Sequence, residues 1–297
     1  MIKVLDLNFL GHKQTIAAFL VETSIGPILF ETGPHSSWSN LGIALAEHGY
    51  KYSDIRHVFI THIHLDHAGA AWAMAEHGAD IYMHPLGTAH MIDPSKLLAS
   101  ATKIYGDKMD YLWGQLKPIP ANKVKAIADG AILRFGDTEI KAHYTPGHAI
   151  HHIAWQIGDE IITGDVAGVC INNGPAVPPC PPPDINIEDW ITSIHKLKSL
   201  NPKGLFLTHF GRVDAPESHL EYLEERLIRW TNFIKEKYNE GIELQDLIAL
   251  FRNTTLDELQ GHSIDDEDLK RYDAANPADM SVTGILRYWK KKGELTE

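Results

Sequence analysis

The stretch Thr61-His62-Ile63-His64-Leu65-Asp66-His67 places four side chains that can bind metal within six positions, at the end of a short apolar strand. Because side chains alternate along a strand, we expect His62 and His64 to project to the same side. Asp66 and His67 follow at the turn into the next helix and can approach from a second direction. Imidazole binds zinc, iron and similar ions, and the added carboxylate leaves room for two ions close together. The stretch therefore predicts a metal site.

Three further polar residues each follow a short apolar run or a turn that closes one. His148 follows a Pro-Gly turn, Asp165 follows residues 161–164, and His209 follows residues 205–208. A single residue in such a place is most often a surface or capping residue. The repetition of the pattern at three strand ends favours one shared site.

The composition predicts a soluble globular protein. Of the 297 residues, 44% are hydrophobic and 22% are charged, which provides ample material for a core. The formal net charge of -12 would repel phosphate backbones and anionic lipids, so the sequence predicts neither nucleic-acid nor membrane partners. No apolar run approaches the roughly 20 residues of a membrane-spanning helix. Cys170 and Cys180 are too few for a disulfide framework, and we expect free thiols in a cytoplasmic protein.

The first two thirds of the chain have the alternation of an α/β fold. Residues 1–32 contain short β-rich runs, and residues 40–49 have a helical pattern. Residues 91–117 interrupt this alternation with two short helical patterns, which predicts a helical insertion. A strand-like rhythm then resumes from 124 to 206. Within it, residues 175–183 contain six prolines; such a segment is stiff and is either a plain connector or a rigid wall of the site.

From Pro216 onward the sequence has helical patterns. Apolar residues with a 3-4-3-4 spacing predict one buried helical stripe: Leu220, Leu223, Leu227, Trp230 and Ile234. A second helix is expected at about 242–252. A third is expected to have Asn276 as its cap and Pro277 in its first turn, and to end before Gly293.

On these residues, and on the turn Phe30-Glu31-Thr32-Gly33, the chain resembles the metallo-β-lactamase superfamily. It is similar in particular to the hydrolase branch that includes glyoxalase II and the acyl-homoserine lactonases. The resemblance implies an α/β fold, an αββα sandwich of two similar halves with the site along one edge. Residues 1–213 would form this catalytic domain, with 91–117 as a helical insertion. Residues 214–297 would form a helical C-terminal extension packed on the core.

The resemblance also implies a dinuclear metal site as the cofactor. One group of three residues would bind the first ion, a second group would bind the other, and one aspartate would bridge both: His62, His64 and His148; Asp66, His67 and His209; and Asp165. Zinc is the expected metal for both divalent ions. Iron or manganese would accept the same oxygen-rich ligands.

Departures from the family narrow the function without naming a substrate. Class B β-lactamases lack the aspartate equivalent to Asp165, which disfavours antibiotic hydrolysis, and flavodiiron proteins have glutamate in place of His64. Lactonases have a tyrosine shortly after the bridging aspartate, where this chain has Val166-Ala167-Gly168. The basic glutathione-binding pattern of glyoxalase II is not found in residues 214–297. Glu31 stands where the family usually has aspartate.

These features predict a hydrolase that cleaves an ester, thioester or lactone of a small-molecule substrate with a hydroxide held between two metal ions. Asp66 is expected to act also as a proton shuttle through its second oxygen. His152 lies four residues past a proposed ligand and is expected to support the site or to contact substrate. Two other functions stay open. One is hydrolysis of a small or cyclic phosphodiester, because the superfamily includes tRNase Z, and the other is a non-hydrolytic metal-binding or redox role.

Substrate choice is expected to lie in the segments added to the shared core. The insertion 91–117, the proline-rich segment 175–183 and the C-terminal helices are therefore the predicted pocket walls. Their exposed apolar stripes could also form a homodimer. Histidines without motif support are expected to be surface or capping residues: His12, His48, His77, His90, His195, His219 and His262.

Overall fold

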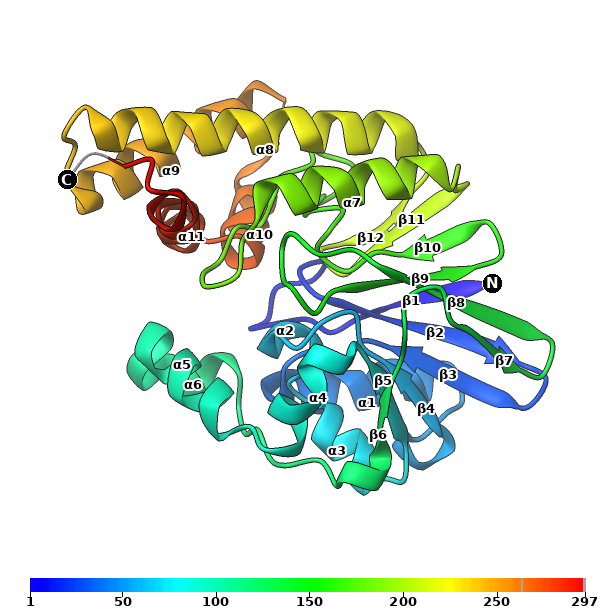
Figure 1. Cartoon of the computed structure of the whole chain (residues 1–297). Helices are drawn as coiled ribbons and strands as arrows, with labels where there is room; N and C mark the ends of the chain where they lie inside the picture. Colours follow the sequence, from blue (N-terminus) through cyan, green and yellow to red (C-terminus); the bar gives the residue numbers. More distant parts are fainter. Residues whose placement is uncertain (263, 296–297) are drawn as a thin grey trace.

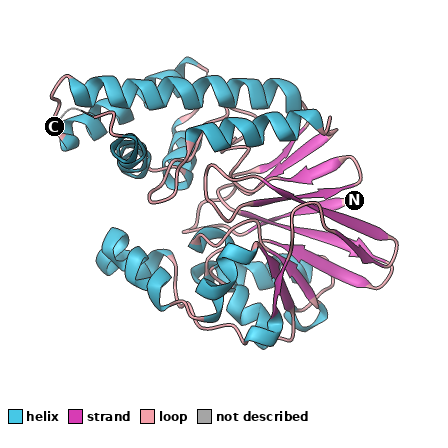
Figure 2. Cartoon of the chain, in the orientation of Figure 1, coloured by secondary structure: helices cyan, strands magenta, loops and turns pink. Residues whose placement is uncertain are grey.

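Two six-stranded sheets lie at the centre of the computed structural model, which describes residues 1–262 and 264–295 (Figures 1 and 2). Within each sheet the strands follow one another in chain order. The first sheet consists of β1 Ile2–Asp6, β2 Ala17–Thr23, β3 Gly26–Phe30, β4 His57–Phe59, β5 Asp80–Met83 and β6 Val124–Ala126. The second consists of β7 Ile132–Phe135, β8 Thr138–Tyr144, β9 Ile153–Ile157, β10 Glu160–Ile162, β11 Gly204–Leu207 and β12 Gly211–Val213.

Helices cover the outer faces of both sheets (Figure 2). The helices of the first half are α1 Trp38–Glu47, α2 Leu65–Ala68, α3 Ala71–Glu76, α4 Pro85–Ile92, α5 Ser95–Tyr105 and α6 Met109–Leu112. The later helices are α7 Ile187–Ser199, α8 Pro216–Asn239, α9 Leu244–Gly261, α10 Asp266–Ala275 and α11 Ala278–Lys292. In Figure 1, α7 and α8 lie over the second sheet, and α5 and α6 stand out beside the first half.

Strand pairing brings the loops of the site together. In the first sheet, β3, β4, β5 and β6 pair in parallel. In the second, β10 and β11 pair in parallel, with Ile161 opposite Leu205. Parallel neighbours end at the same edge of a sheet, so the residues that follow β10 and β11 lie side by side. The loop that follows β4 meets them from the other sheet.

The layers follow from the alternation of side chains along the strands. On β4, Val58 belongs to an outer cluster with Leu45 of α1. The next residue, Phe59, points between the sheets, where its ring stacks on Phe30 at 4.9 Å and meets Trp155 of β9 edge-on at 5.0 Å. The predicted αββα sandwich of two similar halves is therefore confirmed.

The strand-like rhythm predicted from 124 to 206 is wrong for residues 187–199, which form α7. The apolar residues of this helix have the 3-4-3 spacing of one buried stripe: Ile187, Trp190, Ile194 and Leu197. The side chain of Asn186 caps the helix by accepting a hydrogen bond from the N–H of Asp189 at 3.2 Å. The helical pattern was thus present in the sequence, inside a range assigned to strands.

The C-terminal helices differ in detail from the prediction. Helix α9 continues to Gly261, well beyond residue 252, and α10 was not predicted. Asn276 is not the cap of the last helix but the residue that ends α10, and Pro277 precedes the first turn of α11. A residue before proline is forced away from helical backbone angles, which explains the break at Asn276. Gly293 ends α11 in the left-handed conformation, as predicted.

The C-terminal helices share one core with the second sheet. The predicted stripe on α8 is buried throughout. It packs in the same cluster as Leu205 of β11, Phe251 of α9 and Val282 of α11. The division of the chain near residue 213 stays a prediction. Among the described residues, no helix is both long and apolar enough to cross a membrane.

Candidate metal centre

The seven predicted ligand residues come together at one edge of the sandwich. Because β4 ends at Phe59, His62 and His64 lie in the loop that follows it, and Asp66 and His67 lie in the first turn of α2. The other three come from the loops after β8, β10 and β11. The ligand atoms form three overlapping groups, within each of which all atoms lie within 4.8 Å of one another: His62, His64 and His148; His62, His67 and Asp165; and Asp66, His67 and His209.

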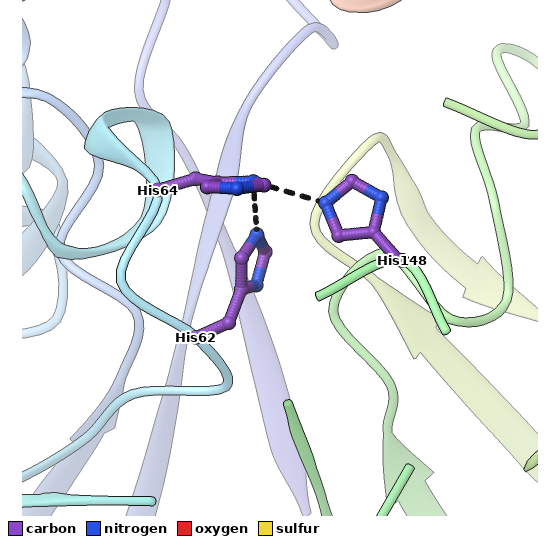
Figure 3. Close-up of side chains that lie close together, drawn as sticks. All are labelled: His62, His64 and His148. Atoms are coloured by element: carbon purple, nitrogen blue, oxygen red, sulfur yellow. Dashed lines mark hydrogen bonds between the residues drawn. The ribbon is translucent and has the colours of Figure 1, made fainter. Parts of the chain in front are cut away.

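The first group, which we call the histidine trio, consists of His62, His64 and His148 (Figure 3). The Nδ1 atom of His64 lies 2.9 Å from Nε2 of His62 and 3.0 Å from Nε2 of His148. Figure 3 shows the three rings converging from two different loops. Three imidazole nitrogens that converge on so small a space suit a divalent cation such as zinc.

The second group, which we call the mixed trio, consists of Asp66, His67 and His209. Oδ2 of Asp66 lies 3.6 Å from Nε2 of His67 and 3.4 Å from Nε2 of His209. The carboxylate of Asp165 lies between the two trios. Its Oδ1 is 3.2 Å from Nε2 of His67, and its Oδ2 is 3.4 Å from Nε2 of His148. Each oxygen of Asp165 therefore faces a different trio.

Three buried polar atoms in this centre have no hydrogen-bond partner among the described residues: Nε2 of His67, Nε2 of His209 and Oδ1 of Asp165. A buried polar atom without a partner costs free energy, and most such atoms in proteins are paired. All three atoms are of the types that bind divalent metal ions. The residues present therefore fit two cations.

Main-chain carbonyls hold two of the imidazoles. Nδ1 of His148 donates a hydrogen bond to the carbonyl of Pro179 at 2.9 Å, and Nδ1 of His209 donates one to the carbonyl of Thr15 at 2.8 Å. A proton on Nδ1 leaves the lone pair of Nε2 facing the centre, which is the tautomer that a metal requires. The proline-rich segment thus positions a candidate ligand, His148, through its backbone.

Side chains hold two other imidazoles, those of His67 and His62. One of these supporting side chains is Glu31, whose role the sequence left open. Oε2 of Glu31 lies 3.0 Å from Nδ1 of His67, and Oε1 accepts a hydrogen bond from the N–H of Thr61 at 2.8 Å. The backbone of Glu31 has φ of +63°, a conformation unusual for a residue other than glycine. In the histidine trio, the hydroxyl of Thr61 lies 3.1 Å from Nδ1 of His62.

The two trios differ in their electrostatics. Burial holds the pKa of His62 and that of His64 well below the ordinary value for imidazole, and neighbouring histidines lower both further. Burial would also lower the pKa of His67, but the carboxylates of Asp165, Asp66 and Glu31 outweigh it and raise this pKa well above the ordinary value. Burial opposes ionisation of Asp66 and Asp165, but neighbouring imidazoles outweigh it: they lower the pKa of Asp66 to about 2 and hold that of Asp165 well below its ordinary value.

His152 lies beside the centre without facing it. Its Nδ1 is 2.8 Å from the hydroxyl of Thr145, and its Nε2 accepts a hydrogen bond from the N–H of Asp165 at 3.3 Å. Gly164 makes this approach feasible, since a Cβ at that position would lie 2.8 Å from Nε2 of His152 and 2.5 Å from the hydroxyl of Thr61. His152 therefore contacts the backbone of Asp165 rather than the centre itself, and its predicted role at the site stays a prediction.

His219 and the two cysteines lie away from the centre. The prediction of His219 as a surface or capping residue is wrong, because α8 buries it against the loop after β10, where its Nε2 donates to the carbonyl of Ala167 at 2.7 Å. Cys170 and Cys180 are free, as expected, and both are buried. Burial raises the pKa of Cys170 to about 11 and also raises that of Cys180, so neither is set up as a nucleophile.

A cavity of about 470 Å³ opens onto the centre at His64, Asp66 and Asp165. Its walls come from α5 and α6, from the prolines at 179–183 and from the junction of α10 and α11. The three segments predicted as pocket walls therefore do line the site. Phe9 also lines the cavity but lies outside the predicted wall segments, and no sequence motif marks it.

Comparisons with known proteins agree with this architecture. Residues 14–209 match the Metallo-beta-lactamase superfamily. The chain is 30% identical over 176 residues to the metallo-beta-lactamase fold-containing protein ST1585 of Sulfurisphaera tokodaii, covering 58% of this chain and 66% of that protein. It is 25% identical over 191 residues to the atrochrysone carboxyl ACP thioesterase of Aspergillus fumigatus, covering 63% and 48%. It is 27% identical over 108 residues to a hydroxyacylglutathione hydrolase of Shewanella sp. strain ANA-3, covering 36% and 33%.

Solved structures show the same fold. The metallo-beta-lactamase family protein TTHA1429 of Thermus thermophilus has a TM-score of 0.68 at 18% sequence identity, covering 98% of this chain and 94% of that one. The structure of ST1585 has a TM-score of 0.63 at 22% identity, covering 77% and 85%. The aligned regions span from a third to two thirds of the curated relatives named above. The fold, the match over 14–209 and the gathered residues at the sheet edge agree, and the chain belongs to the metallo-beta-lactamase superfamily.

Proposed function

We propose that this protein is a hydrolase that cleaves an ester, thioester or lactone with two divalent cations. The histidine trio would hold one cation, the mixed trio the other, and Asp165 would bridge them. The observation that carries this proposal is the position of Asp165, whose two oxygens face different trios at 3.2 and 3.4 Å. The unpartnered nitrogens of His67 and His209 support it. Zinc suits this donor set, and manganese or iron would also accept it.

When bound, two such cations acidify a shared water to a pKa near neutrality and polarise the carbonyl of a substrate. The chain's own residues prepare this chemistry. Carbonyls and side chains fix the imidazole tautomers, and the hydrogen bond from the N–H of Asp165 to His152 holds the backbone that carries the Asp165 carboxylate. Because these groups are held before substrate arrives, little reorganisation is needed during the reaction.

Asp66 is the residue we assign to proton transfer. Its Oδ2 faces the mixed trio, whereas Oδ1 takes no part in those contacts. The side chain is 23% exposed and lines the cavity, so it touches both the centre and the space where substrate would bind. With a pKa near 2, it is ionised at neutral pH and can accept a proton at Oδ1 and pass it to the leaving group.

The test combines metal analysis with a substrate panel on the purified protein. We expect two cations per chain by mass spectrometry, loss of turnover on chelation and its return when zinc, manganese or iron is added back. The panel contains aryl esters, thioesters, lactones and small or cyclic phosphodiesters. Turnover of the first three classes supports the proposal. Turnover of phosphodiesters alone, or two bound cations without turnover of any class, would overturn it. Among the described residues no other group of three ligands is present, so bound ions report on this centre.

A further inference from the structure

The cavity beside the metal centre is lined mainly by carbon. Helix α5 contributes Leu97, Ala101 and Ile104, which share one face at spacings of four and three residues. Across the cavity, α11 contributes Met280 and the proline-rich segment contributes Pro182. The same cavity reaches His64, Asp66 and Asp165, so this apolar space is continuous with the candidate reaction centre.

The apolar face of α5 is only partly covered by protein core, because Leu97 packs against the core of the first half. Ala101 is the one buried residue of this helix, and it belongs to none of the three core clusters of the described chain. Ile104 is 41% exposed although it lines the cavity. Figure 1 shows α5 and α6 standing apart from α10 and α11. An apolar ligand between these walls would remove their side chains from water, which is favourable.

The charged residues in the walls of the cavity provide no net attraction for an anionic ligand. Apart from the metal-facing residues, the charged residues that line it are Lys108 on one wall and Asp279 on the other, which carry opposite charges. Burial, and then the negative charges of Asp66 and Asp279, raise the pKa of Tyr105, so this phenol stays neutral. No arginine lines the cavity among the described residues. The walls therefore suit a neutral hydrocarbon better than a phosphate-bearing group.

We propose that this cavity binds the hydrocarbon acyl chain of the substrate, so that the enzyme prefers esters or thioesters of medium-length fatty acids. The proposal rests on the proposed hydrolase function and adds the substrate class. The scissile carbonyl would lie at His64, Asp66 and Asp165, and the chain would extend between α5 and α11. A volume of about 470 Å³ is within the usual range for a small-molecule site.

The first experiment measures kcat/KM of the metal-loaded enzyme on p-nitrophenyl esters from acetyl to decanoyl. Burial of each methylene contributes about 0.8 kcal/mol, which corresponds to about a fourfold rise in kcat/KM per methylene until the cavity is full. The ratio of kcat/KM on the octanoyl ester to that on the acetyl ester therefore measures chain binding. A flat series would overturn the proposal.

Two variants test the position of the chain. Ala101→Phe fills the cavity from α5 and should lower the octanoyl-to-acetyl ratio at least about tenfold, since several methylenes lose their place. Met280→Phe narrows the cavity from the opposite wall and should also lower this ratio. It provides the test if Ala101→Phe fails to fold. Ala99→Phe is the matched control, because Ala99 is on the same helix but lies outside the cavity. It should keep the parent ratio; an equal loss in Ala99→Phe would overturn the assignment.

Binding of unreactive primary alcohols, from butanol to octanol, separates this proposal from the hydrolase proposal. Calorimetry should show affinity that rises with each methylene in the parent protein and in Ala99→Phe, with loss in Ala101→Phe. If the alcohols bind in this way and no ester or thioester is cleaved, the hydrolase function fails and the chain site stands. The opposite result combines cleavage of short esters with a flat ester series and no binding of the alcohols. In that case the chain site fails and the hydrolase function stands.

Discussion

The histidine trio and the mixed trio present different electrostatic environments to a cation. Burial holds the pKa of His62 and His64 well below the ordinary value, so these imidazoles are neutral and ready to bind metal. In the mixed trio, nearby carboxylates overcome the effect of burial and raise the pKa of His67 and of His209. These two imidazoles hold their protons more tightly than a free histidine does, and a cation must displace those protons in order to bind.

From this difference we expect the two trios to bind metal with different affinities, although Asp165 faces both of them. The histidine trio offers nitrogen ligands that need not release a proton. The mixed trio offers a carboxylate, Asp66, whose charge attracts a cation more strongly once the protons have left. Because Asp165 faces both trios, occupancy of one changes the field at the other. Substitutions in one trio at a time can therefore distinguish the contributions of the two trios to metal binding.

The largest effect is expected for Asp165→Ala, which removes the carboxylate that faces both trios. Metal content should fall below two cations per chain, and turnover should fall by at least about a thousandfold, because metal ions provide several kcal/mol of transition-state stabilisation. Mass spectrometry of the purified variant and steady-state kinetics measure the two effects. Asp159→Ala is the control, since Asp159 is exposed at the turn between β9 and β10. Two cations and full turnover in Asp165→Ala would remove the bridge from the mechanism.

A paired substitution separates the trios. His64→Ala removes a ligand of the histidine trio alone, and His209→Ala removes one of the mixed trio alone. Each variant should retain about one cation per chain and lose turnover by several hundredfold, since each removes one of two cooperating ions. Cobalt substitution distinguishes the remaining sites, because four-coordinate and higher-coordinate ions absorb light differently. Identical spectra from the two variants would mean that the trios are not separate sites.

The proton-transfer role of Asp66 is tested by Asp66→Asn, which keeps the shape and one oxygen ligand but removes the charge. Turnover should fall by about a hundredfold, within the usual range for loss of a general acid or base. Metal content is measured on the same sample, so that loss of metal is not mistaken for loss of proton transfer. Full activity with both cations bound would exclude Asp66 as the shuttle.

Three of the candidate ligands could be located from the sequence because each follows a recognisable strand. His148, Asp165 and His209 follow apolar runs, and a side chain at a strand end reaches the edge of the sheet whatever the rest of the fold does. The alternation of strand and helix patterns predicted the α/β class, whereas the αββα sandwich and the full ligand set came from the family resemblance. The insertion at 91–117 also had a clear helical pattern, and its place as a pocket wall followed from its being an addition to the core.

Other features depend on tertiary contacts that no local pattern encodes. Glu31 reaches His67 because β3 and β4 are parallel neighbours and because its backbone adopts a φ of +63°. Ala101 lines the cavity because of the way α5 is placed beside the first half of the molecule. His219 is buried because α8 packs over the second sheet. Each of these positions has an unremarkable residue type in the sequence, so its role became visible only when distant segments were placed together.

The next test of the difference between the two trios is a substitution of Glu31, because this residue is not itself a member of the mixed trio but contacts its His67. Glu31→Gln keeps the size of the side chain but removes the charge that faces Nδ1 of His67. Affinity of the mixed trio for metal should fall about 10- to 100-fold, the usual effect of removing a group that orients a metal ligand. Titration with a competing chelator measures it. The cation of the histidine trio should be retained, and equal weakening of both ions would contradict a local role.

The smallest effect is expected for Thr61→Val, the corresponding change behind the histidine trio. The hydroxyl of Thr61 faces Nδ1 of His62 at 3.1 Å, and valine preserves its shape while removing the polar atom. The N–H of Thr61 that holds Glu31 remains, so the mixed trio keeps its support. A neutral hydrogen bond contributes about 1 kcal/mol, so metal affinity of the histidine trio should fall only about fivefold. The same chelator titration compares Thr61→Val with Glu31→Gln. If Thr61→Val weakens metal as much as Glu31→Gln, the charge behind the mixed trio is not what distinguishes the two sites, and the contrast between them must come from the ligands themselves.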